Sequence, residues 1–159
     1  MLWIKEKINK SEKILLSEVV KKESHKFDLL NKLEDTEQDP EWHSEGNVFI
    51  HTQMVIDETI LLFDDHELSD HEKYVLVMAA IFHDIAKPIT TKRREINGVE
   101  RVVAPKHEYF GMSYLFYRFS GEMSLHEKTD ILNLIGYHQL PKLLVVKNKS
   151  EWHYRQLTQ

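Results

Sequence analysis

The sequence predicts an all-α protein that carries one short β-hairpin. The 159 residues include only 5 glycines and 4 prolines, too few for the many tight turns of an all-β fold. Long stretches rich in leucine, isoleucine, glutamate and lysine favour helices instead. The length suits one compact domain, and a hydrophobic content of 42% is enough to bury a core. We therefore expect a single domain over residues 1–159.

The composition excludes several classes of protein. Because the chain has no cysteine, it has neither a disulfide scaffold nor a Cys-based zinc site. Charged residues directly follow Met1–Ile4, so no signal peptide is expected, and no stretch approaches the roughly 20 apolar residues that cross a bilayer. The net charge of −5 argues against broad binding to nucleic acid. We expect a cytoplasmic protein with no membrane partner.

The first part of the chain is expected to be helical and then to open into a loop. Residues 1–35 would form an N-terminal helical extension. Mixed charge and apolar spacing predict helix over residues 9–34, with a break near Glu23-Ser24. The segment from Asp35 to Asn47 is expected to be a loop, because Asp39-Pro40 interrupts any regular pattern.

Two longer helices are expected next. A helical period runs from Val48 to about Phe63, and the residues on its inward stripe are Val48, His51, Val55, Thr59 and Leu62. Ser69-Asp70-His71-Glu72 fits a capping box, with serine at the N-cap and glutamate three residues later. The helix that it starts should run to about Ala86, where Pro88 is close enough to stop it. It is apolar nearly all round, so we expect it to be central and buried.

A hairpin and further helices complete the expected fold. Asn97-Gly98 between two short strand-like runs is the strongest short-range signal for a β-hairpin, here near residues 92–103. A helix should cover His107–Phe119, and a second capping box at Ser124-Leu125-His126-Glu127 should open another. The inward stripe of that helix holds Ile131, Leu134, Ile135 and His138. Residues 141–159 are expected to contain the beginning of a last helix that is cut short.

The adjacent pair His83-Asp84 lies near the C-terminal end of the expected central helix. Burying a polar side chain without partners costs roughly 1–3 kcal/mol, and an unpaired carboxylate costs much more. A divalent cation would compensate both groups, since imidazole nitrogen and carboxylate oxygen suit transition metals. The alternative is structural: Asp84 pairs with Lys87 or caps a neighbouring helix, and His83 bonds to a carbonyl.

Histidines on three other expected helices favour the metal site. His51 lies inward on the preceding helix, which a short loop would place antiparallel to the central one. His107 opens the helix after the hairpin, and His138 ends the inward stripe of the next helix. A single histidine of this kind is more often a core or surface residue. Four helices that each supply a candidate ligand are hard to explain without a metal.

This ordered set of residues resembles the HD superfamily of phosphohydrolases, which is named for the adjacent His-Asp pair. The closer likeness is to the subgroup fused to bacterial tRNA nucleotidyltransferases and poly(A)-polymerase-like proteins. The likeness extends over residues 39–140, which would form the metal-binding core. The segments that carry it are His43-Ser44-Glu45-Gly46-Asn47-Val48-Phe49-Ile50-His51-Thr52, Phe82-His83-Asp84-Ile85-Ala86-Lys87-Pro88, His107-Glu108 and Tyr137-His138.

The resemblance implies an HD-domain helical bundle that holds one or two divalent ions of Mn, Fe, Ni, Co or Zn. It also implies that the protein is a phosphohydrolase, which cleaves a phosphate ester with metal-activated water. The implied ligands are His51, His83 and Asp84 for a first ion, and Asp84, His107 and His138 for a second. Asp84 and Lys87 would be the catalytic residues, with Lys87 directing its charge at the substrate phosphate. A plain salt bridge to a nearby acid is the alternative for Lys87.

The charge of the hairpin region independently favours a phosphate substrate. Between Lys87 and Lys106 the otherwise acidic chain has six basic residues against two acids. Fixed cations there would attract and orient a phosphate, and we expect Arg93 and Arg94 to bind substrate together with Lys87. The alternative is an ordinary solvated hairpin with charges of both signs.

One aspartate of the HD pattern is missing. HD enzymes complete the first metal's shell with a late aspartate on a helix well after the second motif. Here the last aspartate is Asp130, which comes before His138. Three interpretations stay open: the chain is cut short within its final helix, the site is incomplete, or Asp130 replaces the missing ligand from an exposed position near a helix start.

The expected substrate is therefore a small phosphorylated molecule, a nucleotide, or an RNA end such as a cyclic or terminal phosphate. This expectation rests on the resemblance, because a fold alone does not determine function. The rival hypothesis is a regulatory or binding module of HD fold that holds metal or nucleotide without turnover. The oligomeric state does not follow from the sequence.

Overall fold

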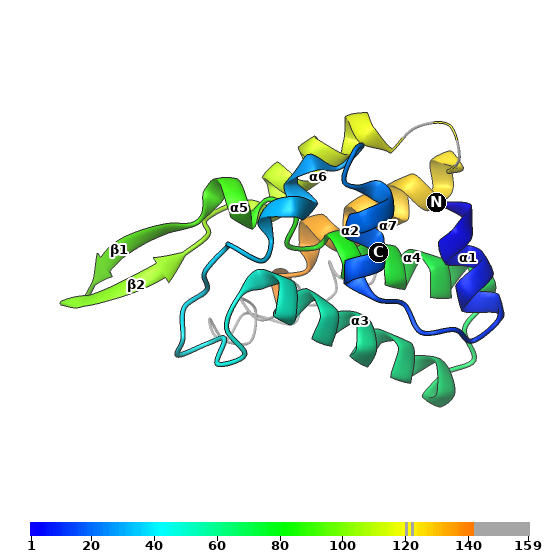
Figure 1. Ribbon diagram of the computed structural model, residues 1–159, viewed down its shortest axis with the longest axis horizontal. Coiled ribbons are helices and arrows are strands. Elements are labelled where there is room, and N and C mark those ends of the chain that lie inside the picture. The colour runs from blue at the N-terminus through cyan, green and yellow to red at the C-terminus, as the bar shows by residue number, and fades with distance from the viewer. Residues whose placement is uncertain (120, 122, 142–159) are drawn as a thin grey trace, which may run out of the picture.

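Helix α4 (Asp70–Phe82) is the element against which α1, α3 and α7 pack. The computed structural model describes residues 1–119, 121 and 123–141. Figure 1 shows a body of helices with one hairpin that projects from it, so the predicted all-α fold with a short hairpin is confirmed. The other elements are α1 (Leu2–Asn9), α2 (Leu16–Glu23), the 3-10 helix η1 (Asp28–Lys32), α3 (Val48–Asp65), α5 (Lys87–Thr90), β1 (Lys92–Ile96), β2 (Val99–Val103), α6 (His107–Arg118) and α7 (Leu125–Tyr137).

Both predicted capping boxes are present, and they fix where α4 and α7 begin. The Ser69 hydroxyl accepts a hydrogen bond from the backbone N–H of Glu72, and the Glu72 carboxylate accepts one from the backbone N–H of Ser69 at 2.8 Å. Ser124 and Glu127 form the same reciprocal pair at the start of α7. A cap of this kind stabilises a helix by about 1 kcal/mol. Two helices of the candidate site therefore have defined starting points.

The predicted end of the central helix near Ala86 is wrong. Helix α4 ends at Phe82, His83 is its C-cap residue, and the chain turns before α5 begins at Lys87. Pro88 lies in the first turn of α5, where proline is tolerated because that N–H has no intrahelical partner. Proline here starts a new helix instead of stopping the old one. As a result Asp84 lies in a tight turn beyond the end of α4.

The N-terminal extension is less continuous than predicted. Helix α1 ends at Asn9, where the predicted helical region was to begin, and α2 covers only Leu16–Glu23. Ser11 has a left-handed backbone (φ 53°), which no helix accommodates, so the helical path is interrupted there. The predicted break near Glu23-Ser24 is confirmed by the end of α2. The following loop is also confirmed, with a single bridge from Glu37 to Asn47.

The predicted inward stripes of α3 and α7 are each partly wrong. The buried positions are Val48, Thr52 and Ile56 on α3, and Glu127, Ile131, Leu132, Ile135 and Gly136 on α7. Leu62 is 44% exposed and Leu134 is 41% exposed, because each helix buries a narrower face than an apolar stripe suggests. His51 and His138 lie at the edges of these buried faces and are half-buried.

The hairpin has the predicted turn. Strands β1 and β2 pair antiparallel, with Ile96 opposite Val99, so Asn97 and Gly98 alone form the loop. Both have positive φ angles, 54° and 78°, as a two-residue turn of this kind requires.

Among the described residues, no helix is both long enough and apolar enough to span a membrane. The predicted last helix, except for Pro141, lies outside the described residues.

Three aromatic rings pack behind the end of α4 and connect distant parts of the chain. The ring centroid of Phe82 lies 4.8 Å from that of Phe27 and 5.5 Å from that of Phe119, and those two lie 5.8 Å apart. All three side chains are buried. Because Phe82 directly precedes His83, this cluster fixes the backbone from which the His83-Asp84 pair projects.

Replacing Phe82 with alanine should therefore destabilise the fold by about 3–5 kcal/mol, since it removes a fully buried ring and leaves a cavity. The matched control is Phe116→Ala, because the Phe116 side chain is 53% exposed. That change should cost less than about 1 kcal/mol. Urea denaturation followed by circular dichroism measures both. Equal losses for the two variants would contradict the placement of Phe82 in the core.

Candidate metal centre

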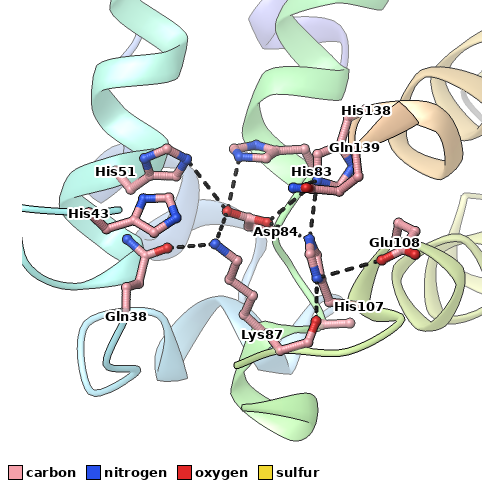
Figure 2. Close-up of polar contacts among 12 residues, drawn as sticks. Gln38, His43, His51, His83, Asp84, Lys87, His107, Glu108, His138 and Gln139 are labelled. Carbon is pink, nitrogen blue, oxygen red and sulfur yellow. Dashed lines mark hydrogen bonds and ion pairs between the residues drawn. The ribbon is translucent and has the colours of Figure 1, made fainter. Parts of the chain in front are cut away.

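A buried carboxylate lies at the meeting point of four helices. Asp84 is 1% exposed and occupies the turn after α4 (Figure 2). His83 caps the end of α4, His107 is the first residue of α6, and His138 caps the end of α7. His51 lies in the first turn of α3. The structure thus brings together all five residues that the sequence singled out as metal ligands.

The four imidazoles divide between the two oxygens of Asp84. On one side, Asp84 Oδ2 lies 3.1 Å from Nε2 of His83 and 3.6 Å from Nε2 of His51. On the other side, Asp84 Oδ1 lies 3.1 Å from Nε2 of His107 and 3.8 Å from Nε2 of His138. Two groups of three candidate ligands, each with all its donor atoms within 4.8 Å of one another, therefore share one carboxylate.

The second nitrogen of each imidazole has a hydrogen-bond partner that can only accept. Nδ1 of His83 lies 2.9 Å from the carbonyl oxygen of Ala80. Nδ1 of His107 and of His138 likewise face backbone carbonyls, at 2.6 and 2.7 Å. Nδ1 of His51 faces a carboxylate oxygen of Glu45 at 2.7 Å. In the neutral state each Nδ1 must carry the proton, which leaves the Nε2 lone pair directed at Asp84.

Lone pairs that face one another repel unless a positive charge lies between them. Nε2 of His107 is 3.1 Å from Nε2 of His138, and neither oxygen of Asp84 has a hydrogen-bond partner of good geometry. Ligands held at about 2.0–2.1 Å from one transition-metal ion are themselves about 3 Å apart. The spacing and the nitrogen and oxygen donors of both groups therefore fit such an ion.

The electrostatics of the cluster keep His51, His138 and Asp84 in the forms that bind a cation. Burial lowers the pKa of His138 to about 4 and also lowers the pKa of His51, so both are neutral near pH 7. Burial alone would raise the pKa of Asp84, but His83, His107 and Lys87 hold it well below its usual range. Burial opposes charge on His83 too, yet the adjacent Asp84 carboxylate outweighs it and raises the pKa of His83.

Lys87 forms a salt bridge with Asp84, which is one of the two roles predicted for it. Its Nζ lies 2.8 Å from Asp84 Oδ2 and donates a hydrogen bond to Oε1 of Gln38 at 2.5 Å. The residue is only 7% exposed, so the ammonium group belongs to the cluster and not to the solvated surface. Gln38, from the loop before α3, was not foreseen because nothing in its local sequence marks it.

Two further residues of the site were missed as participants, His43 and Glu45. The Glu45 oxygen that accepts from His51 also lies 2.9 Å from Nδ1 of His43. His43, Glu45 and His51 form a third group of closely spaced potential ligands. Glu45 orients His51 in the way that outer carboxylates orient metal-bound histidines. The sequence did point to these two residues, since His43-Ser44-Glu45 begins the first motif of the family resemblance.

A pocket in the surface adjoins the cluster. Its lining includes Lys87, His107 and His43 from the cluster and its immediate neighbours, together with Gln139, Trp42 and Val102. Arg93 and Arg94 lie on the exposed part of the hairpin and are not among the residues that line it. The Arg93 guanidinium pairs with Glu37 at 2.6 Å and with Glu100 at 2.9 Å. Lys87 is therefore the predicted substrate-binding cation that borders this pocket.

Asp130 is not part of this centre. It precedes His138 by eight residues on α7, which is roughly 12 Å along a helix. Its carboxylate instead contacts His71 and His126. The predicted possibility that Asp130 replaces the late aspartate of the HD pattern is therefore wrong, because α7 carries it away from Asp84.

The proton positions can be tested without any metal. In metal-free protein at alkaline pH, the rings of His51, His107 and His138 should carry their proton on Nδ1, although free histidine prefers Nε2. Long-range ¹H–¹⁵N correlation spectra distinguish the two tautomers. His25 and His66 are exposed and serve as internal controls with the ordinary preference. Protonation on Nε2 in the cluster would show that its lone pairs do not face Asp84.

Comparison with known proteins gives one match. The family model of the HD domain matches residues 48–155. No curated protein and no solved structure was found to match the chain. HD domains are typically metal-dependent phosphohydrolases, and the His/Asp groups around Asp84 are able to bind a metal. The match covers more than half of the sequence, and the adjacent His83-Asp84 pair within it lies at the centre of the cluster. The chain therefore belongs to the HD domain family.

Proposed function

We propose that this protein is a phosphohydrolase that uses one or two divalent transition-metal ions to cleave a phosphate ester of a nucleotide or of an RNA end. The ligands would be His51, His83 and Asp84 for one ion, and Asp84, His107 and His138 for the other. Manganese, iron, nickel, cobalt and zinc all suit this set of nitrogen and oxygen donors. Asp84 would bridge the two positions.

The observation that carries this proposal is the convergence of lone pairs on a buried carboxylate. Four imidazoles are each fixed through Nδ1 so that Nε2 faces Asp84. Lys87 directs an ammonium group at Asp84 Oδ2, and the raised pKa of His83 favours an Nε2–H group there as well. At Oδ1, the rings of His107 and His138 in their neutral state place acceptors against an acceptor, and such a set is stable when a cation lies between them.

Other residues of the chain would bind and orient the substrate. A divalent cation would supply the Lewis acidity that ionises water near neutral pH and neutralises phosphoryl charge. Lys87, held by Asp84 and Gln38, borders the pocket and would meet one phosphoryl oxygen with its ammonium group. His43 and Gln139 line the same pocket and offer polar atoms to the rest of the substrate.

The pocket favours a substrate with a flat ring next to its phosphate. Trp42 lines the pocket and is 63% exposed, which gives a nucleobase an aromatic surface for stacking. A mononucleotide would fill this pocket alone. An RNA end would extend further, along the exposed hairpin that carries Arg93 and Arg94. This second form of the substrate agrees with the likeness to HD domains fused to tRNA nucleotidyltransferases and poly(A)-polymerase-like proteins.

A second candidate function is metal or nucleotide binding without turnover. It is favoured by the incomplete shell of the position formed by His51, His83 and Asp84, where the described residues supply no aspartate equivalent to the late one of HD enzymes. Lys87 lies close to the same carboxylate oxygen and already provides a positive charge there. A module of this kind would bind metal and ligand with the residues named above but release the ligand unchanged.

The proposal is tested by assaying a 2′,3′-cyclic mononucleotide, a nucleoside monophosphate and an aryl phosphate with each metal in turn. Hydrolysis of at least one substrate is expected, with loss of activity on chelation and recovery on readdition of metal. Asp84→Asn should lower kcat/KM more than about 100-fold, because loss of an outer partner of a metal ligand alone costs 10–100-fold. His66→Ala is the control and should change nothing.

The outcomes separate the two candidates. Hydrolysis that depends on metal and on Asp84 supports the phosphohydrolase. Metal bound in proportion to protein, with no turnover of any substrate, supports the binding module instead. If Asp84→Asn does not fold, as circular dichroism would show, His138→Ala takes its place, since His138 is only half-buried. Activity that survives in whichever of these variants folds would overturn the proposal.

A further inference from the structure

A second group of potential metal ligands lies at the opposite ends of α4 and α7. His71 Nε2 is 2.9 Å from Asp130 Oδ2, and His126 Nδ1 is 2.6 Å from the same oxygen. The two imidazole rings meet edge to face, with centroids 4.7 Å apart. All three donor atoms lie within 4.8 Å of one another. Two nitrogens and one oxygen therefore converge on a common point.

The helices explain why these residues meet. His126 and Asp130 are four residues apart on α7 and so lie on one face of that helix. His71 lies in the first turn of α4, which packs beside α7. At the far ends of the same two helices, the rings of His83 and His138 lie 5.3 Å apart. His71 precedes His83 by twelve residues, as His126 precedes His138, so α4 and α7 run side by side in the same direction.

This spacing makes the group separate from the centre around Asp84. Twelve residues of helix correspond to about 18 Å. No ligand is shared between the two, since the donors here are His71, His126 and Asp130. Acidic residues in the first turns of both helices, Asp70 and Glu72 on α4 and Glu127 on α7, offset the positive ends of the helix dipoles near a bound cation.

We propose that His71, His126 and Asp130 form a distinct binding site for a single transition-metal ion, with zinc as the cation that the donors suit best. Two imidazoles and one carboxylate are a common protein ligand set for zinc, which leaves a fourth position for water. The side chains are partly exposed, at 38% for His71 and 36% for Asp130, so an ion can enter from solvent. The small movements that coordination requires cost little in such side chains.

An ion at this place would connect the first turns of α4 and α7. The same two helices carry His83, Asp84 and His138 at their other ends. A bound ion would therefore add a structural clamp to the frame that supports the candidate metal centre, at a distance from its chemistry. The proposal is independent of the proposed phosphohydrolase activity, because it concerns occupancy and stability only.

The test is calorimetric titration of the full chain with Zn²⁺ alone. The wild-type protein should bind one equivalent more than His126→Ala and one more than Asp130→Asn. His126 is 75% exposed, so its replacement should leave the fold intact. His66→Ala is the matched control, because His66 is also an exposed histidine but belongs to none of the described groups of potential ligands. It should bind as many equivalents as the wild type.

A second readout tests the clamp. Zn²⁺ should raise the melting temperature of the wild type and of His66→Ala more than that of His126→Ala, since only the first two retain the link between α4 and α7. Equal stoichiometry in wild type, His126→Ala and Asp130→Asn would overturn the site. Loss of an equivalent in His126→Ala but not in Asp130→Asn would also overturn it, because the carboxylate would then not be a ligand.

Discussion

The carboxylate of Asp84 is the group on which the arrangement of this molecule depends. It is buried among four imidazoles and one ammonium group at the place where α3, α4, α6 and α7 meet. An isolated buried charge is costly, so the surrounding helices must supply compensation for it. Lys87 supplies part of this compensation, and the imidazole nitrogens offer ligands for a cation that would supply the rest. The positions of the helices and the candidate metal chemistry thus both depend on compensating the buried charge of Asp84.

The frame around this group is built from simple local devices. Two capping boxes fix the starts of α4 and α7, and an aromatic cluster fixes the end of α4 just before His83. Backbone carbonyls three residues earlier orient three of the histidines, so each ligand is positioned by its own turn of chain. Such positioning needs no long-range partner. It explains how the cluster can be formed before any ion binds.

The sequence predicted the parts of this structure that depend on strong local signals. The capping boxes, the Asn97-Gly98 turn and the order of the helices all follow from short patterns, and so does the set of histidines that meets at Asp84. The predictions that were wrong concern features that depend on three-dimensional packing. Pro88 was expected to end a helix and instead begins one, and Leu134 was expected inside but is exposed. Gln38 could not be foreseen by spacing, because a loop brings it to Lys87.

The most direct test of the central claim is a crystal structure of the protein soaked with Mn²⁺, with anomalous diffraction data. We expect an anomalous peak between Asp84 Oδ1 and the Nε2 atoms of His107 and His138, within coordination distance of all three. A second peak between Oδ2, His51 and His83 would show that both positions are used. The absence of any peak beside Asp84, with its oxygens hydrogen-bonded to protonated imidazoles, would contradict the claim that the cluster exists to hold a metal.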